Sequence, residues 1–554
     1  MDLLERIQGL ILPSHPYFLV MTKTSDLKPR RLRSRRWNKQ LWPTMLAALT
    51  LASLSLLVWG SNLCPPSCQC LHNLTTIVCQ EKGLSQIPEL PDGTEQLYVS
   101  YNNIQEIPRR GLEKLQDLDL TKNELNVFLS LNPAWPNMAN LSKLFLRGNG
   151  LTVLHPDLSN NKLTNLSEGS LRGLIKLSEL DLNSNLIDYL PSKVFSNLRR
   201  LKILDLYSNR LTSLSLDVFS NLIHLQELQL DSNQISNLPV GVFDSLSKLS
   251  ELQLASNRIL EIHPALFNKL KALQNLNLED NAIKHLPEGV LHKTRALKKI
   301  CLSDNQIKSL HPSVFNGLVK IHLLSFSGNH LSSLHPDQFK DLVSLKELHL
   351  DGNHIGNIPA SLFMNLKKLV TLNLDRNRIL ELSPDHFVGL TCLKDLRLSF
   401  NQLSDIPFKT FHPLQNLRKL KLNNNILASL RPQLFAQLTK LTELSLDGNK
   451  LNHLHPDVFQ GLTNLQKLSL KSNQLRAVDN GTFELLRKLK AIHLSGNLWD
   501  CTCKQNVYIS SWVNVHRDML GDQPMCFFSS SSPYSGYTAL TGSPVSPVVT
   551  GSLH

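Results

Sequence analysis

The feature that most constrains this chain is a repeat with a period of 24 residues. Its marker is the asparagine of an L-x-L-x-x-N pattern, which comes into step at Asn161 and ends at Asn497. Between these two, the marker recurs at Asn185, Asn209, Asn233, Asn257, Asn281, Asn305, Asn329, Asn353, Asn377, Asn401, Asn425, Asn449 and Asn473. A single unit of this length cannot bury its own leucines, so neighbouring units have to stack into a solenoid.

Each part of the repeat suggests a structural role. L-x-L predicts a short strand whose leucines point inward and whose intervening residues point outward. The marker asparagine suits the turn after that strand, where its amide can bond backbone groups that would otherwise have no partner. A phenylalanine ladder follows each marker by ten residues, from Phe195 to Phe483 with Leu291 as one exception. We expect this ladder to fill the opposite side of the core, where an extended or 3-10 segment returns.

The N-terminal part of the chain reads as an export signal. Residues 1–44 form a basic extension that contains "KPRRLRSRR", and we expect it to be disordered. The apolar stretch 45–61 is shorter than the ~20 residues that a membrane span needs, which favours a signal peptide over a retained signal anchor. Met45 is therefore an alternative start. Because the basic run directly precedes this apolar stretch, the formal net charge of +13 does not indicate nucleic-acid binding.

Seven of the nine cysteines lie near the two ends of the repeats, which favours disulfides in an exported chain over zinc. They are Cys64, Cys68, Cys70, Cys79, Cys501, Cys503 and Cys526. The other two, Cys301 and Cys392, lie within the repeats nearly four coils apart, a separation of ~18 Å that excludes a bond between them. We expect two free thiols there, with an intermolecular bridge through Cys301 or Cys503 as the alternative.

Over residues 94–497 the pattern LxxLxLxxNxLxxLxxxxFxxLxx resembles the extracellular leucine-rich repeat family with cysteine-capped ends. Residues 62–93 resemble its N-terminal cap, and "GNLWDCTC" with Cys526 resembles its C-terminal cap, over 498–526. The repeats look most like those of the carboxypeptidase N regulatory subunit, platelet glycoprotein V, chondroadherin and Slit-like proteins. The resemblance implies an α/β solenoid: a right-handed horseshoe with a parallel β-sheet on its concave face and loops or 3-10 segments on its convex face. It also implies the disulfides Cys64–Cys70, Cys68–Cys79 and Cys501–Cys526.

Two departures from the family pattern stand out. Asn149 and Asn161 are only 12 residues apart, so the repeats are irregular over 124–161 and we expect a local defect or a looser loop. The C-terminal cap has three cysteines instead of four, which makes it partial and leaves Cys503 unpaired. The Ser/Pro-rich tail 527–554 is expected to be disordered.

Catalytic signatures are missing from the sequence: it holds no G-x-S-x-G, H-E-x-x-H or Walker motif, and no acidic or cysteine partner recurs with its His-Pro pairs. We therefore expect neither an enzyme, nor a cofactor, nor a metal site. Four sequons are candidate glycan sites, of which Asn73 and Asn480 are favoured: Asn73, Asn140, Asn165 and Asn480.

The outward positions of each strand, six, four and two residues before the marker, predict the binding face. In the first half they hold seven carboxylates and no lysine or arginine; the residues singled out are Glu179, Asp181, Asp205, Tyr207, Glu227, Asp231, Glu251 and Glu279. In the later half the face is mixed with a basic lean, through Arg397, Lys419, Lys421, Lys467 and Lys471. Solubility alone could account for acidic strands, but a surface that steers a basic protein segment is the functional interpretation.

These observations predict a secreted or cell-surface scaffold that binds an extracellular protein through its concave face. The partner class is a basic segment, a matrix protein or a secreted enzyme. Two alternatives stay open: the ectodomain of an adhesion or signalling receptor whose anchor is missing, and a regulatory carrier subunit of a secreted enzyme. A membrane is expected as a partner only if the signal anchor is retained or a longer isoform exists.

Overall fold

A computed structural model describes residues 63–108, 110–125, 138, 140–145, 149, 163–164, 166, 168, 171, 174–500, 507–527 and 537–539. The predicted extension 1–44 and signal segment 45–61 lie outside these residues, as do Asn161, Asn165, Cys501 and Cys503. No helix among the described residues is both long enough and apolar enough to cross a bilayer.

The described residues form two main sheets of short strands, one after the other, and a two-stranded sheet near the C-terminal end. The first begins with an antiparallel pair and continues in parallel, in the order β1 (Gln69–Leu71), β2 (Thr76–Val78), β3 (Gln96–Tyr98), β4 (Asp117–Asp119) and β5 (Lys143–Phe145). The second sheet has 14 parallel strands in sequence order. They are β6 (Glu179–Asp181), β7 (Ile203–Asp205), β8 (Glu227–Gln229), β9 (Glu251–Gln253), β10 (Asn275–Asn277), β11 (Lys299–Cys301), β12 (Leu323–Ser325), β13 (Glu347–His349), β14 (Thr371–Asn373), β15 (Asp395–Arg397), β16 (Lys419–Lys421), β17 (Glu443–Ser445), β18 (Lys467–Ser469) and β19 (Ala491–His493).

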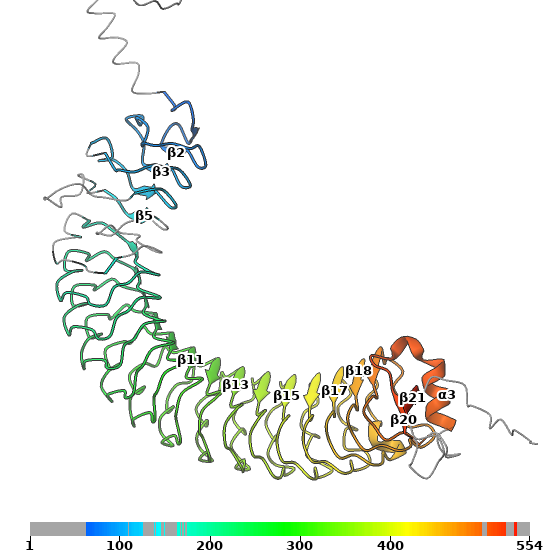
Figure 1. Cartoon of the computed structure of the whole chain (residues 1–554). Coiled ribbons are helices and arrows are strands. Elements are labelled where there is room, and N and C mark those ends of the chain that lie inside the picture. Colours follow the sequence, from blue (N-terminus) through cyan, green and yellow to red (C-terminus); the bar gives the residue numbers. More distant parts are fainter. Residues whose placement is uncertain are drawn as a thin grey trace, which may run out of the picture. The chain divides into compact units, whose positions relative to one another are not determined.

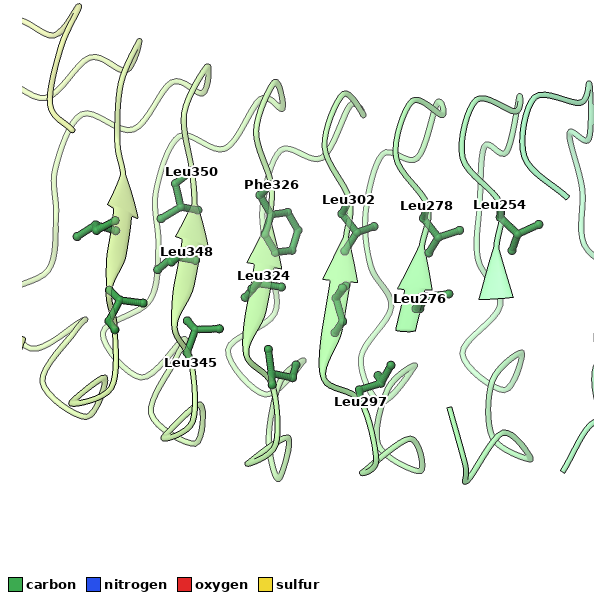
Figure 2. Packing of buried hydrophobic residues seen from close by; sticks show 14 of the residues in the cluster. Leu254, Leu276, Leu278, Leu297, Leu302, Leu324, Phe326, Leu345, Leu348 and Leu350 are labelled. Atoms are coloured by element: carbon green, nitrogen blue, oxygen red, sulfur yellow. The ribbon is translucent and has the colours of Figure 1, made fainter. Parts of the chain in front are cut away.

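Each coil of the larger sheet contributes the same strand in the same register. Leu324 of β12 pairs with Leu348 of β13, and both are fully buried, whereas the residues on either side of each point outward. Figure 2 shows the buried side chains of successive coils, such as Leu302 and Leu350, stacked along the core. In Figure 1 the strands from β11 to β18 lie side by side on the inner, concave side of the coils. The predicted solenoid and its inward–outward alternation are confirmed.

The marker asparagines form a buried ladder between coils. The amide nitrogen of Asn329 donates to the carbonyl oxygens of Leu302 and Phe326, at 2.9 and 3.1 Å. Its oxygen accepts from the backbone amide of Ile307 at 3.0 Å. Because Leu302 and Ile307 belong to the preceding coil and Phe326 to the same coil, the ladder fixes the spacing of the coils as well as each turn.

The return path of each coil is made mostly of turns, with a single described 3-10 segment in the repeats, η2 (Pro456–Phe459). The phenylalanines pack along it; the rings of Phe387 and Phe411 are stacked with centroids 6.2 Å apart.

The two sheets meet at the irregular repeat. The backbone amide of Ser178, next to β6, donates to the carbonyl oxygen of Ser142, next to β5, at 3.0 Å. Within the larger sheet the equivalent bond joins residues 24 apart, as between Lys202 and Ser178, whereas Ser142 and Ser178 are 36 residues apart. Next to β5 and β6, the described residues thus bring together parts of the chain that are one and a half repeats apart.

The caps close the ends of the core. Disulfides join Cys64 to Cys70 and Cys68 to Cys79, the pairing that the family resemblance implies. At the other end, α3 (Val507–Val515) and η4 (Arg517–Met519) follow the buried Trp499. Cys526 is disulfide-bonded, while the predicted partner Cys501 lies outside the described residues.

One short segment of the tail, which was expected to be disordered, forms a strand. Tyr537–Ala539 form a strand, β21, which pairs antiparallel with β20 (Met525–Phe527) at the end of the cap. The sequence could not show this pairing, because three residues of a Ser/Pro-rich segment become a strand only when a partner edge accepts their backbone bonds.

Candidate binding surface

All thirteen residues predicted for the binding face occupy outward positions of the larger sheet. Nine lie at the ends of strands, on either side of a buried central residue: Glu179, Asp181, Asp205, Glu227, Glu251, Arg397, Lys419, Lys421 and Lys467. The other four follow two residues after a strand: Tyr207, Asp231, Glu279 and Lys471. Because adjacent parallel strands are ~4.8 Å apart, the residues on β6–β10 form one surface and those on β15–β18 a second, with β11–β14 between them.

Carboxylates on neighbouring strands of the acidic half are in direct register. Asp181 of β6 pairs with Asp205 of β7, and Glu227 of β8 pairs with Glu251 of β9. Like charges placed directly opposite each other destabilise a sheet, by a few tenths of a kcal/mol to about 1 kcal/mol. A cationic partner placed over Glu227 and Glu251 would reduce the repulsion between them.

Two of these carboxyl groups have raised pKa values. Burial is the main reason that the pKa of Asp231 rises to about 6, and the nearby carboxylates of Asp205 and Glu251 add to it. The backbone amide of Ala255, which donates to Asp231 at 2.5 Å, opposes that rise. Burial also raises the pKa of Asp205, against hydrogen bonds from Tyr207 and Asn183.

Neighbouring amides orient the glutamates without neutralising them. The side-chain nitrogen of Gln229 donates to Glu227 at 2.5 Å, and that of Gln253 donates to Glu251 at 2.6 Å. A neutral donor leaves the full charge on each carboxylate, so this stretch keeps its negative potential.

Where β5 meets β6, the acidic face is hollowed by a cavity of about 140 Å³. Its walls combine apolar and acidic side chains: Leu144, Phe145, Glu179, Leu180, Asp181, Ile203, Asp205 and Gln229. At one edge the Lys143 ammonium is 3.6 Å from the Glu179 carboxylate. Sequence reasoning missed this hollow, because the adjacency of β5 and β6 across 36 residues departs from the repeat.

The later half of the face is less basic than its composition indicates. Arg397 pairs with Asp395 at 2.9 Å, and Lys419 pairs with Glu443 at 3.5 Å. Lys421, Lys467 and Lys471 form no ion pair with any carboxylate in the described part of the chain. The positive charge available to a partner is therefore concentrated on β16 and β18.

The remaining candidate residues lie away from any assembled site. Asn73, Asn140 and Asn480 are exposed. Cys301 is partly buried on the concave face, where burial raises the pKa of its thiol and Glu279 raises it further. Within the described residues, no group of three or more histidine, cysteine or acidic side chains could hold a metal ion.

A family model for the leucine rich repeat matches the chain in seven overlapping segments that together run from residue 157 to residue 498. The chain belongs to the leucine-rich repeat family. The matched region coincides with the larger sheet, so family membership and the observed strands describe the same residues.

Among curated relatives of this leucine-rich repeat protein, lumican from Coturnix japonica is 31% identical over 135 residues, covering 22% of this chain and 39% of lumican. Epiphycan from Homo sapiens is 30% identical over 149 residues, covering 24% of this chain and 45% of epiphycan. The match thus spans less than half the length of these relatives, which are small leucine-rich proteoglycans.

Solved structures with the same fold include receptors and bacterial proteins. A leucine-rich repeat protein of Leptospira interrogans superimposes with a TM-score of 0.61 at 29% identity, covering 73% of this chain and 96% of that one. The TLR13–ssRNA13 complex superimposes with a TM-score of 0.58 at 26% identity, covering 79% of this chain and 75% of that one. The leucine-rich repeat chain therefore resembles both matrix proteoglycans and receptor ectodomains.

Proposed function

We propose that this chain is a non-enzymatic extracellular scaffold that binds a basic segment of another protein on the acidic half of its concave face. The observation that carries the proposal is the register of like charges, Asp181 with Asp205 and Glu227 with Glu251, on one rigid sheet. Such a surface attracts a basic partner from a distance and accelerates association more than it strengthens the final complex.

The proposal fits the relatives and the chemistry of the face. The chain resembles matrix proteoglycans and receptor ectodomains, and this likeness supports a binding role outside the cell. The hollow between β5 and β6 offers apolar contact from Phe145 next to the carboxylates of Asp181 and Asp205. An arginine or lysine side chain fits this combination, since its methylene stem packs on apolar surface while its head group meets carboxylates.

The acidic half disfavours nucleic acid as a ligand of the same face. Phosphate groups would be repelled by Glu227, Asp231 and Glu251, and the neighbouring sheet positions supply no lysine or arginine between β6 and β10. The single-stranded RNA in the TLR13 complex is therefore no guide to the ligand of this surface.

The test is a triple substitution, Glu227→Lys, Asp231→Lys and Glu251→Lys, in the secreted chain. Binding to an immobilised basic peptide of alternating lysine and serine should weaken at least about tenfold at ~0.15 M salt, and its salt dependence should flatten. The matched control replaces three exposed acids off this face, Glu261, Asp337 and Glu381, with lysine. Equal affinity and equal salt dependence in the concave variant and the native chain would remove the proposal.

A second measurement distinguishes three roles for the chain: a carrier of a secreted enzyme, a receptor ectodomain and a matrix protein. The native chain and the triple variant are each used to capture proteins from plasma and from matrix extract. A partner retained by the native chain and lost by the triple variant identifies the class: a secreted enzyme favours the carrier role, a matrix protein the matrix role, and a cell-surface protein the receptor role.

A further inference from the structure

A second charged surface lies on the flank of the coils, just before the strands of the larger sheet. It comprises the four residues that stand ten to seven positions before each marker from Asn185 to Asn497. In these fourteen coils the four positions hold eighteen lysines and arginines, two histidines and no aspartate or glutamate. We call this set the basic flank: Lys176, Arg199, Arg200, Lys202, His224, Lys248, Lys271, Arg295, Lys298, Lys320, His322, Lys346, Lys367, Lys368, Lys394, Arg418, Lys440, Arg487, Lys488 and Lys490.

The fold brings these residues to one edge. Each group of four contains one buried leucine or isoleucine, and Figure 2 shows two of them, Leu297 and Leu345, at the ends of the coils where the strands begin. The flank residues on either side of Leu297, which are Arg295 and Lys298, are exposed. All the lysines and arginines of the flank are exposed in the same way, so the row faces solvent along the whole sheet.

Backbone hydrogen bonds hold the row rigid. The amide of His322 donates to the carbonyl of Lys298 at 2.7 Å, and the amide of Lys346 donates to that of His322 at 2.8 Å. The same bond joins Val370 to Lys346 and Lys394 to Val370, both at 2.8 Å. Successive coils therefore present their charges at the strand spacing of ~4.8 Å, without any cost of ordering the backbone on binding.

The charge of the flank is not neutralised within the described chain. Every ion pair among the described residues uses a cation outside the flank. Lys440 and Lys488 donate to the amide oxygens of Asn416 and Asn464, at 2.6 and 2.7 Å, and such neutral partners leave both charges in place. The pKa of His322, which lies in the same row, is lowered by burial and by the positive charges of Lys346, Lys298 and Lys368.

The opposite edge of the same coils carries no such excess. Its exposed residues, one to four positions after the marker asparagines, mix both signs: they include Lys284, Lys308 and Arg378 as well as Glu261 and Glu381. The basic flank is therefore a property of one side of the solenoid and not of its composition as a whole.

We propose that the basic flank binds a sulfated glycosaminoglycan, a linear polyanion that lies across successive coils. A row of cations that runs along one edge of successive coils matches an extended chain of sulfate and carboxylate groups, and lysine- and arginine-rich surfaces of this kind bind heparin. A nucleic acid fits less well, because single strands bind by stacking on aromatic side chains, and the flank positions contain no phenylalanine, tyrosine or tryptophan. The flank and the acidic concave face would then serve two different ligands.

The experiment measures binding of the full-length secreted chain to immobilised heparin over a range of salt concentrations. The test variant carries Lys298→Gln, Lys346→Gln and Lys368→Gln, and the matched control carries Lys284→Gln, Lys308→Gln and Arg378→Gln on the other edge. We expect the flank variant to bind heparin at least about tenfold more weakly at ~0.15 M salt and with a flatter salt dependence. The control, which loses the same charge, should bind within about twofold of the native chain.

Further outcomes would overturn the proposal. If the native chain does not bind heparin, the flank is only a solvated surface. If the two variants lose affinity equally, the net charge of the protein determines heparin binding, and the position of the lysines does not. Undiminished binding to fully desulfated heparin would exclude sulfate recognition. Tighter binding to a single-stranded RNA with the same number of charges would assign the flank to nucleic acid instead. Circular dichroism of both variants checks that the fold is kept.

Discussion

The side-chain oxygen of Asn329 accepts a hydrogen bond of 3.0 Å from the backbone amide of Ile307, one coil earlier. Asn329 is 1% exposed, so this bond is shielded from bulk solvent. The same relationship recurs along the sheet, for example between Asn353 and Leu331. The coils are therefore joined to one another by their asparagines as well as by their leucines.

Replacing Asn329 with alanine should destabilise the solenoid by roughly 2–4 kcal/mol, because buried backbone groups of two coils lose their partners. Hydrogen exchange at the amide of Ile307 should accelerate locally before global unfolding, since repeat proteins open coil by coil. Asn365→Ala is the control: this exposed asparagine bonds only the carbonyl of Lys340, at 3.1 Å, and should cost less than about 1 kcal/mol. Similar losses in the two variants would contradict the role given to the ladder.

Replacing Asp231 with asparagine should stabilise the protein at neutral pH. The pKa of Asp231 in the folded chain is about 6, above its ordinary value of 3.8, so folding favours the protonated form. That stabilisation is complete below pH 3.8 and is lost as the pH rises through about 6. Asparagine stays neutral and can still accept the bond from Ala255, so the gain should reach about 1 kcal/mol at neutral pH after solvent screening.

The check on Asp231 is the difference in melting temperature between the variant and the native chain, measured from acid to neutral pH. The difference should be largest near neutral pH and should shrink as the pH falls below about 6. A difference that is independent of pH would mean that the substitution acts through packing. Asp337→Asn, at an exposed carboxylate away from this sheet, provides the baseline.

Two glycines allow the destabilisation caused by a steric clash to be distinguished from that caused by a left-handed backbone conformation. Gly389 has φ +93°, and a Cβ placed there would lie 2.2 Å from the carbonyl oxygen of Met364. Gly289 also has a positive φ, +77°, but a Cβ there would meet no atom within 4 Å. Gly389→Ala should therefore cost roughly 2–4 kcal/mol, against about 1 kcal/mol for Gly289→Ala, where only the left-handed conformation is strained. Thermal or denaturant unfolding of the two variants would measure the difference, and equal costs would contradict the predicted contact.

Asn480 and Asn73 should carry N-linked glycans when the chain is secreted from a eukaryotic cell. Both are exposed, whereas the side chain of Asn140 already donates to the carbonyl of Glu113 at 3.1 Å and accepts from Lys176 at 2.8 Å. Asn480→Gln and Asn73→Gln should each remove one step of the mobility shift that a glycosidase produces. Asn140→Gln should leave the pattern unchanged, and a lost step in that variant would show that the bonded amide is still modified.

The sequence by itself determined the repeating unit. The 24-residue spacing from Asn185 to Asn497 predicted the strands, the alternation around residues such as Leu180 and Leu324, and the asparagine ladder. The strands and the ladder could be predicted because each coil of a solenoid contacts only its neighbours, so the residues of one repeat determine the structure of one coil. The outward positions of the acidic residues followed from the same alternation.

Only the tertiary structure decided what happens where the period fails or where coils act together. The bond between Ser178 and Ser142 joins residues 36 apart in the sequence and opens the hollow beside Phe145, and Tyr537–Ala539 become a strand on the edge of β20. The basic flank depends on tertiary structure in the same way, because bonds such as that from His322 to Lys298 turn scattered lysines into one row. The hollow and the β20–β21 pair arise from contacts between residues whose spacing in the sequence differs from 24. The basic flank arises from many coils together. A single repeat unit therefore encodes none of these features.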